Sequence, residues 1–177
     1  MAVDAGTVRD ATAADAAACA AVYPPYVLST TTTFELEPPN ASEMGRRIAA
    51  AQAQHAWLVL ERDGAVVGYT YGGPIKARPA YRWTCEVSVY LAPNQRGGGG
   101  GRALCTALLD GLTERGYRTV AAGMAQPNKA SAALHRSLGF TTVGTFRRIG
   151  WKLGGWHDVT WVQAELAAGN DPPVEPR

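Results

Sequence analysis

The stretch Val87-Ser-Val-Tyr-Leu-Ala-Pro-Asn-Gln-Arg96-Gly-Gly-Gly-Gly-Gly101-Arg-Ala-Leu-Cys-Thr-Ala-Leu-Leu109 places five consecutive glycines between a strand-like and a helix-like segment. A glycine run at a helix start exposes backbone N–H groups with no Cβ in the way. The helix dipole adds partial positive charge there, which favours a bound phosphate. Arg96 and Arg102 flank the run and would reinforce this effect. The stretch therefore predicts a phosphate-binding loop.

Three other interpretations of the glycine run stay open on the residues alone. A Walker-type P-loop closes on Gly-Lys-Ser/Thr, whereas Arg102-Ala103 follows here. The dinucleotide fingerprint fits formally at Gly98, Gly100 and Ala103, but it needs an acid about 20 residues further on, and the strand expected at 118–124 has none. A flexible linker is the third, and the strand before the run and the helix after it argue against this.

Composition and charge are ordinary for one folded domain. The chain has 177 residues, 46% of them hydrophobic, and a net charge of only +2, so no broad nucleic-acid surface is expected. Cys19, Cys85 and Cys105 are spaced neither as a disulfide framework nor as a metal site. No apolar run reaches the length of a membrane span, and the first residues, with Asp4 among them, do not follow the basic-then-apolar pattern of a signal peptide. We expect a cytoplasmic protein without metal, nucleic acid or membrane as partner.

Hydrophobic periodicity and turn signals predict the order β, α, α, β, β, β, α, β, α, β, β. Strands are expected at Val3–Arg9, Trp57–Glu61, Ala65–Gly72, Trp83–Leu91, Arg118–Met124, Phe140–Arg147 and Trp156–Leu166. Helices are expected at Thr12–Val22, where Pro24-Pro25 ends or kinks the first, and at Ser42–Gln54, Gly99–Arg115 and Ser131–Leu138. This order predicts a single α/β (α+β) domain over residues 1–168, followed by a disordered tail at 169–177.

Two motifs together resemble the GNAT N-acetyltransferases. The Arg96–Leu104 segment resembles that family's Arg/Gln-x-x-Gly-x-Gly/Ala loop, and Asn128–Phe140 resembles its Asn-x-x-Ser and aromatic-x-x-x-Gly-Phe signature. The resemblance covers nearly the whole chain. It implies a mixed, mostly antiparallel central sheet of about seven strands, splayed near an acetyl-CoA site and flanked by about four helices.

The resemblance also assigns the residues that would hold acetyl-CoA, the implied co-substrate. The strand backbone would pair with the pantetheine arm, the glycine loop would cradle the pyrophosphate, and the start of a later helix would complete the site. These residues are Val89, Tyr90, Leu91, Arg96, Gly97, Gly98, Gly99, Gly100, Gly101, Arg102, Asn128 and Ser131. Gly97, Gly98 and Gly100 are more glycines than the family loop requires, and we interpret them as a local loosening.

A narrower resemblance concerns the acceptor. Gly73–Tyr90 and Gly154–Val159 resemble the phosphinothricin and methionine sulfone/sulfoximine acetyltransferases, which implies a small amino-acid-like amine and a homodimer. The implied acceptor-binding residues are Phe34, Lys76, Ala77, Arg78, Tyr81, Glu86 and Val87. Tyr26 and Glu35 are further candidates for the pocket wall. The basic residues of this set are equally consistent with a solvated loop.

Two side chains are candidates for proton transfer. Strand alternation puts Glu86 on one face just before the glycine loop, where a carboxylate could accept the ammonium proton or position the amine. A salt-bridged Glu86 is the alternative. His135 stands where many members of the family carry a tyrosine acid, or it packs against helix and cofactor. N–H groups near Val89 or Leu91 would hold the oxyanion.

The function expected is direct acetyl transfer in a ternary complex to the α-amino group of such an acceptor. Two alternatives stay open: a CoA-binding sensor or partner module without turnover, and an acetyltransferase for a protein N-terminus or a polyamine. The basic cluster Lys76, Arg78 and Arg82 argues against a polyamine, which carries positive charge itself.

Overall fold

A computed structural model describes residues 6–168 and 173–177 of the chain. The strands are β1 (Thr7–Asp10), β2 (Trp57–Arg62), β3 (Ala65–Pro74), β4 (Thr84–Leu91), β5 (Thr119–Ala125), β6 (Thr141–Lys152) and β7 (Gly155–Glu165). The α-helices are α1 (Ala16–Val22), α2 (Pro24–Ser29), α3 (Ala41–Gln54), α4 (Gly100–Glu114) and α5 (Lys129–Ser137), with short 3₁₀ turns at Ala13–Asp15, Pro79–Tyr81 and Pro93–Gln95. The predicted order of elements is confirmed apart from α2.

Two helix boundaries differ from the prediction for local reasons. Tyr23 joins α1 to α2 with helical dihedrals, φ −83° and ψ −32°, so the two form one helix kinked at the prolines. Pro24 starts α2, where a missing N–H does no harm. Helix α3 is capped two residues earlier than expected, because the side chain of Asn40, rather than that of Ser42, accepts a hydrogen bond from Glu43 N at 2.9 Å.

One sheet with the order β1-β2-β3-β4-β5-β7-β6 runs through the described part of the chain. All neighbouring pairs are antiparallel except β4 and β5. That parallel pair spans only Thr84–Glu86 against Thr119–Ala121, although β4 has 8 residues. The two strands therefore diverge after Glu86, and the sheet opens into a fork at its centre, as expected from the resemblance.

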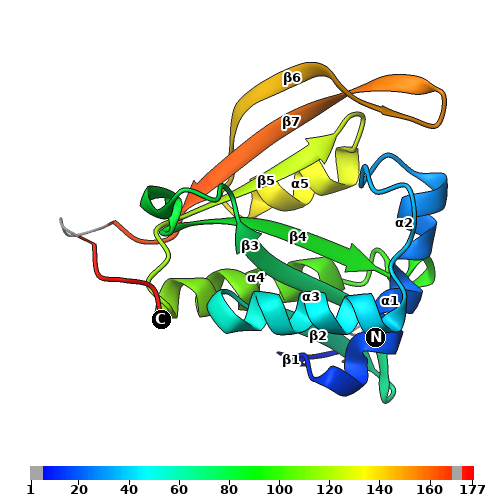
Figure 1. Cartoon of the computed structure of the whole chain (residues 1–177), viewed down its shortest axis with the longest axis horizontal. Coiled ribbons are helices and arrows are strands. Elements are labelled where there is room, and N and C mark those ends of the chain that lie inside the picture. The colour runs from blue at the N-terminus through cyan, green and yellow to red at the C-terminus, as the bar shows by residue number, and fades with distance from the viewer. Residues whose placement is uncertain (1–5, 169–172) are drawn as a thin grey trace.

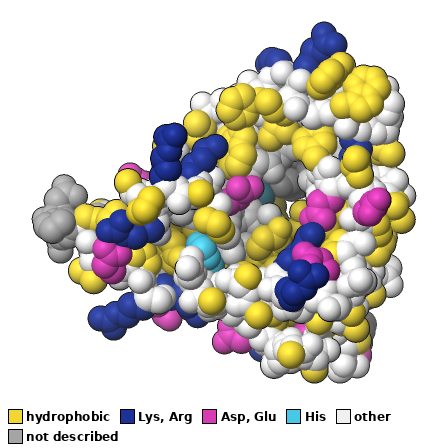
Figure 2. Space-filling model, viewed as in Figure 1, with side chains coloured by type: hydrophobic (Ala, Val, Ile, Leu, Met, Phe, Trp, Pro, Cys, Tyr) yellow, Lys and Arg dark blue, Asp and Glu magenta, His cyan; other side chains and the backbone are white. Residues whose placement is uncertain are grey.

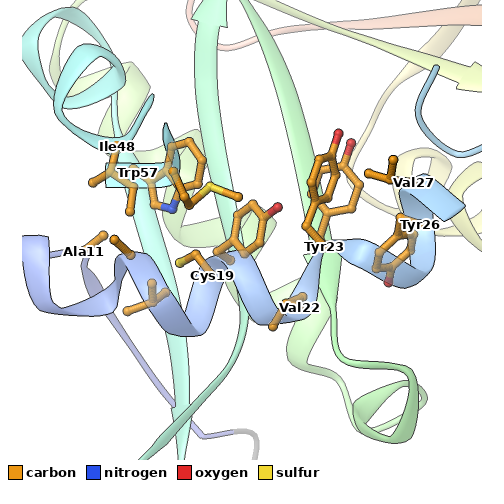
Figure 3. Packing of buried hydrophobic residues seen from close by; sticks show 13 residues of the cluster. Ala11, Cys19, Val22, Tyr23, Tyr26, Val27, Ile48 and Trp57 are labelled. Carbon is orange, nitrogen blue, oxygen red and sulfur yellow. The ribbon is translucent and has the colours of Figure 1, made fainter. Parts of the chain in front are cut away.

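Helices cover both faces of the sheet (Figure 1). On one face, α1, α2 and α3 pack on β2 and β3 around Trp57 and Tyr69, which are 2% and 1% exposed. Figure 3 shows Cys19 and Val22 of α1 and Ile48 of α3 in this cluster. On the other face, the apolar side of α4 packs against β4 and β5 in a second cluster. The two cores fix the central strands and with them the fork.

Strands β6 and β7 form a long hairpin that rises away from the rest of the sheet (Figure 1). Several large apolar side chains on it are about half exposed or more. These are Val143, Phe146, Ile149, Trp151, Leu153 and Trp156. The hairpin thus carries more than half of the exposed large hydrophobic side chains in the part of the chain that the structure describes.

The C-terminal residues 173–177, for which the sequence predicts disorder, lie against the domain, while 169–172 fall outside the described residues. Glu175 accepts hydrogen bonds from the Arg82 guanidinium, one of them at 2.6 Å, and Trp83 Nε1 donates to Val174 O at 2.8 Å. Arg177 N donates to Arg115 O at 2.8 Å. These partners are distant in sequence, so no local pattern could indicate them.

Candidate active site

The fork exposes backbone groups of β4. Ala92 N donates to Val67 O at 2.8 Å, which fixes the alternation of hydrogen bonds between β3 and β4. In an antiparallel ladder alternate residues point their N–H and C=O groups outward. The odd-numbered residues Val87, Val89 and Leu91 therefore turn theirs toward β5, which no longer pairs with them. These groups can pair with an extended ligand arm or hold an oxyanion.

Tyr26 occupies one of these outward-facing pairs of backbone groups, that of Leu91. Its hydroxyl donates to Leu91 O at 2.6 Å and accepts from Leu91 N at 3.2 Å. The Leu91 N–H predicted as an oxyanion donor is thus already engaged, whereas no such side-chain partner bonds the Val89 N–H among the described residues. The Arg96 guanidinium also lies over the Tyr26 ring, 5.2 Å from its centroid. Tyr26 therefore links the end of β4 to the glycine loop.

The glycine loop is shaped by backbone conformations and close approaches that need glycine. Gly97 and Gly99 have φ of +82° and +78°, a region that side chains rarely allow. A Cβ on Gly100 would lie 2.6 Å from Leu60 Cδ2 and 3.1 Å from Arg62 Nη2. Gly97 and Gly100 are therefore required by the geometry, and interpreting them as a local loosening was wrong. Arg62 Nη2 also donates to Gly98 O at 3.2 Å, which steadies the run.

A cavity of about 360 Å³ lies between this loop, the end of β4 and the start of α5. It is lined by predicted cofactor residues, namely Val89, Leu91, Arg96, Gly97, Gly99, Gly101, Arg102, Asn128 and Ser131. The other three predicted residues do not line it. Tyr90 is buried in the aromatic core on the opposite face, Gly98 faces Arg62, and Gly100 faces Leu60.

A second cavity of about 450 Å³ lies on the other side of the fork, within the hollow in the middle of the face shown in Figure 2. Glu86, Phe34 and Glu35 line it, as predicted. Val87 instead lines a narrow cavity of about 50 Å³ beside the fork. Thr32 lines all three cavities, so all three adjoin this residue.

The predicted basic loop lies outside the Glu86 cavity. Lys76, Ala77, Arg78 and Tyr81 are exposed and do not line it. Lys76 still acts on Glu86 through its charge. The loop follows the end of β3, at the same edge as the start of β4, and sequence proximity alone could not tell that its side chains turn outward.

Sequence reasoning missed several aromatic walls of this cavity. Tyr23, at the junction of α1 and α2, lines it together with Tyr71 of β3, Phe146 of β6 and Trp161 of β7. Tyr71 is the cross-strand partner of Ser88, two residues from Glu86, and Trp161 pairs with Gly123 across β5 and β7; these registers were not predictable from local pattern. The alternation of Tyr69 and Tyr71 along β3 is the one signal that could have identified Tyr71.

Glu86 stands at the fork without a hydrogen-bond or ion-pair partner among the described residues. Its environment raises the pKa of the carboxyl, because burial disfavours the charge more than Lys76 favours it. A carboxylate of this kind is a better proton acceptor near neutral pH than an exposed one. Its position and its environment both suit a general base.

Glu35 contrasts with Glu86 in the same cavity. Burial alone would raise its pKa, but hydrogen bonds from Arg47 and the Tyr23 hydroxyl outweigh burial and lower it. Arg47 Nη1 and Nη2 lie 2.7 and 3.0 Å from the Glu35 carboxylate oxygens, and Tyr23 Oη lies 2.9 Å away. Glu35 therefore stays ionised and fixed, and it is not available as a base.

His135 is held inside α5. Its Nδ1 lies 2.8 Å from Ser131 O, an atom that can only accept, so Nδ1 carries the hydrogen and a neutral ring has Nε2 as acceptor. Burial lowers the pKa of His135, and the bond to Ser131 O opposes this only in part. The ring edge packs on Phe140, with centroids 4.9 Å apart. The geometry favours a neutral imidazole.

No cluster of three or more His, Cys, Asp or Glu side chains suited to a metal ion occurs among the described residues. Nor does that part of the chain hold a helix long and apolar enough to cross a membrane. The three cysteines are buried and free.

Comparison with known proteins agrees with this geometry. The family model of the acetyltransferase (GNAT) domain matches residues 8–161. Phosphinothricin N-acetyltransferase of Streptomyces viridochromogenes is 40% identical over 170 residues, covering 96% of this chain and 93% of the relative. The L-methionine sulfoximine/L-methionine sulfone acetyltransferase of Salmonella typhimurium is 35% identical over 164 residues, covering 90% and 94%.

Solved structures give the same result. An acetyltransferase from Salmonella typhimurium with its cofactor acetyl-CoA superimposes with a TM-score of 0.91 and 34% identity, covering 94% of this chain and 96% of the other. A phosphinothricin acetyltransferase from Sinorhizobium meliloti in complex with acetyl-CoA has a TM-score of 0.91 and 35% identity, covering 98% and 94%. Because the family model and these relatives match nearly the whole chain, and because the forked sheet and the glycine loop agree with them, we conclude that the chain belongs to the GNAT acetyltransferase family and is an acetyl-CoA-dependent N-acetyltransferase.

Proposed function

We propose that the protein acetylates the α-amino group of a small amino-acid-like acceptor, of the phosphinothricin, methionine sulfoximine or methionine sulfone type. The observation that carries the proposal is the partly buried Glu86 carboxylate, which has no hydrogen-bond or ion-pair partner among the described residues and lines the acceptor cavity beside the fork. The relatives named for these acceptors cover nearly the whole chain. A cavity of about 450 Å³ suits a small amine.

The residues at the glycine loop fit a bound pyrophosphate. Nothing lies within 4 Å of a Cβ built on Gly97 or Gly99, so a phosphate can approach the backbone there. Arg96 and Arg102 line the same cavity and add positive charge. Acetyl-CoA, when bound, supplies the acetyl thioester, and the Val89 N–H is directed to the fork, where it would donate to the thioester oxygen as negative charge develops.

Glu86 would accept a proton from the acceptor ammonium, directly or through water. The free amine then forms the N–C bond, the C–S bond breaks, and the proton that the nitrogen loses on becoming an amide is taken up by the departing CoA thiolate. The acid role predicted for His135 requires a protonated ring, which its burial disfavours. Direct transfer also fits the cysteines, because burial raises the pKa of Cys85 and Cys105 to about 12 and leaves no reactive thiolate.

An acceptor panel tests this proposal. Purified protein and acetyl-CoA are incubated with methionine sulfone, methionine sulfoximine, phosphinothricin, a short peptide and a polyamine, with release of CoA thiol and the acetylated product both measured. We expect product with the first three and little with the peptide or polyamine. Tight acetyl-CoA binding without any product would point to a CoA-binding module. Product only from the peptide would show that the acceptor is a protein N-terminus and not a small amino acid.

We further propose that the protein is a homodimer through the β6–β7 hairpin. Its half-exposed side chains include Ile149, Trp151 and Trp156, and the last two rings lie 5.4 Å apart. Large contiguous apolar surfaces are rare on monomers. Light scattering after gel filtration should give twice the chain mass for the wild type and one chain mass for Trp151→Glu. A monomeric wild type would refute this.

The cytoplasm is the location that we propose. The support is chemical: the three cysteines are free, which is usual in a reducing compartment. Cell fractionation with an antibody to the protein checks this, and recovery in an extracytoplasmic fraction would contradict it.

A further inference from the structure

Lys152, the last residue of β6, is an unusual buried lysine. It is 4% exposed, and its ammonium donates to Thr33 O at 2.7 Å and to Tyr26 O at 3.4 Å. Lysine is almost never this buried unless its charge is satisfied. Its partners here are backbone carbonyls of another part of the chain, so the side chain joins two segments that are more than a hundred residues apart.

Those carbonyls belong to α2 and to the segment 30–35 that follows it, the segment that brings Phe34 and Glu35 to the acceptor cavity. Figure 1 shows the tip of the β6–β7 hairpin extending toward α2. Side-chain hydrogen bonds from Tyr23 and Arg47 hold the Thr33 hydroxyl and the Glu35 carboxylate. The backbone N–H groups of Thr32 and Glu35, in contrast, bond to nearby Thr hydroxyls. Lys152 therefore supplies a long-range anchor for the backbone of the segment.

Other residues near the tip of the β6–β7 hairpin also contact segment 30–35. A Cβ built on Gly150 would lie 2.5 Å from the Phe34 ring, so the strand packs directly on it. The Phe34 and His157 rings are 6.4 Å apart, and His157 Nε2 lies 2.8 Å from Lys152 O. Phe146 and Ile149 of the same hairpin line the cavity opposite Phe34.

We propose that Lys152 is a positioning residue of the acceptor site. It holds the segment that carries Phe34 and Glu35 against the β6–β7 hairpin, so that the segment and the hairpin, which both line the acceptor cavity, keep their spacing. The inference rests on the proposed function of that cavity. Lys152 does not touch the acceptor. It acts through Phe34 and Glu35, while the cofactor cavity on the other side of the fork keeps its own residues.

The charges around Lys152 are consistent with a clamp rather than an ion pair. Burial lowers the pKa of Lys152, and the nearby Glu35 carboxylate opposes this. The Glu35 oxygens are already bonded by Arg47 and Tyr23, so Lys152 is left with the carbonyls. Removing its ammonium leaves buried acceptors without that donor, which loosens the segment.

Lys152→Met, of similar length but without charge, tests the clamp in the full chain. We expect the KM for methionine sulfone to rise about tenfold, the KM for acetyl-CoA to stay unchanged within error, and Lys152→Arg to restore part of the loss. Arg147→Met is the matched control, because that side chain lies on the same strand but is 76% exposed. We expect it to change neither constant.

A second variant and a second readout keep the test decisive. Gly150→Ala leaves the charge in place but pushes on the Phe34 ring, and it should raise the same KM. Amide hydrogen exchange of Thr32 and Glu35 should accelerate in Lys152→Met, whether or not any amine is acetylated. Unchanged exchange and an unchanged acceptor KM would overturn the clamp, as would an equal rise in both KM values. A wild type that acetylates no amine would instead refute the proposed function.

Discussion

The substitution Glu86→Gln separates base catalysis from positioning. It keeps size and hydrogen-bonding capacity but removes the proton acceptor. An amino-acid ammonium has a pKa near 8 or above, so about a tenth or less of the acceptor is free amine at pH 7. A positioned base typically contributes about 10²–10⁴-fold. We expect kcat/KM for methionine sulfone to fall by about that factor at pH 7, and by progressively less as the pH rises and free amine becomes plentiful.

Glu86→Gln should also change the stability of the protein, in the opposite direction to its activity. Burial raises the pKa of Glu86 in the folded state above its unfolded value. The folded state therefore favours the protonated carboxyl, and that stabilisation is present below the unfolded pKa and lost as the pH rises through the folded pKa. At neutral pH the buried charge is a cost that glutamine removes. Glu86→Gln should melt at a higher temperature than the wild type at pH 7 and show no such gain at acidic pH.

The assay is a pH–rate profile of kcat/KM together with calorimetry at acidic and neutral pH. Glu114→Gln is the control, because Glu114 is an exposed residue on α4 away from both cavities. We expect this control to change neither quantity. A loss of activity that is equal at every pH would refute base catalysis and leave positioning. A lower melting temperature at pH 7 would show that the Glu86 charge is stabilised in the folded protein.

Three further predictions concern the loop and the N-terminal segment. Gly100→Ala should destabilise the protein by about 1–3 kcal/mol and weaken acetyl-CoA binding. Gly111→Ala on the same helix is the control, because a Cβ there would have open space around it, and it should stabilise the protein by about 0.5–1 kcal/mol. Urea melts measure stability and calorimetry measures binding; equal effects of the two substitutions would argue against close packing at Gly100. Arg96→Ala should raise the Kd for acetyl-CoA and reduce its salt dependence, with the acceptor KM unchanged, and titration calorimetry at two salt concentrations measures this; an unchanged Kd places the pyrophosphate elsewhere. The Arg9 hydrogen bond holds the pKa of Asp15 well below its usual range, so Asp15→Asn should cost stability at pH 7 and progressively less as the pH falls below about 4; an equal cost in urea melts at pH 3 and pH 7 would contradict this.

Local signals predicted the frame of the site well. The glycine run, its flanking arginines and the motif that begins at Asn128 are encoded within short stretches, and the structure places them around one cavity. Glu86 could be placed on the correct face because strand alternation is strict. The family resemblance added the fork, which no local pattern contains.

What sequence could not supply depends on contacts between distant segments. The side walls formed by Tyr71 and Trp161 depend on strand register, and the Tyr26 hydroxyl that engages Leu91 crosses from a helix to a strand. Gly100 looked dispensable until Leu60 proved to occupy the space of its Cβ. The proposed clamp through Lys152 could not be predicted either, because Tyr26 and Thr33, whose carbonyls it bonds, lie more than a hundred residues earlier in the sequence.

The proposed reaction is direct acetyl transfer from acetyl-CoA to a small amino acid. Initial rates of thiol release, with acetyl-CoA and methionine sulfone both varied, test it most directly, combined with the intact mass of the protein incubated with acetyl-CoA alone. Direct transfer in a ternary complex should give intersecting reciprocal plots, one N-acetyl product for each thiol released, and no acetyl group on the protein. Parallel plots with an acetylated protein, or no thiol release with any small amine despite tight acetyl-CoA binding, would contradict it.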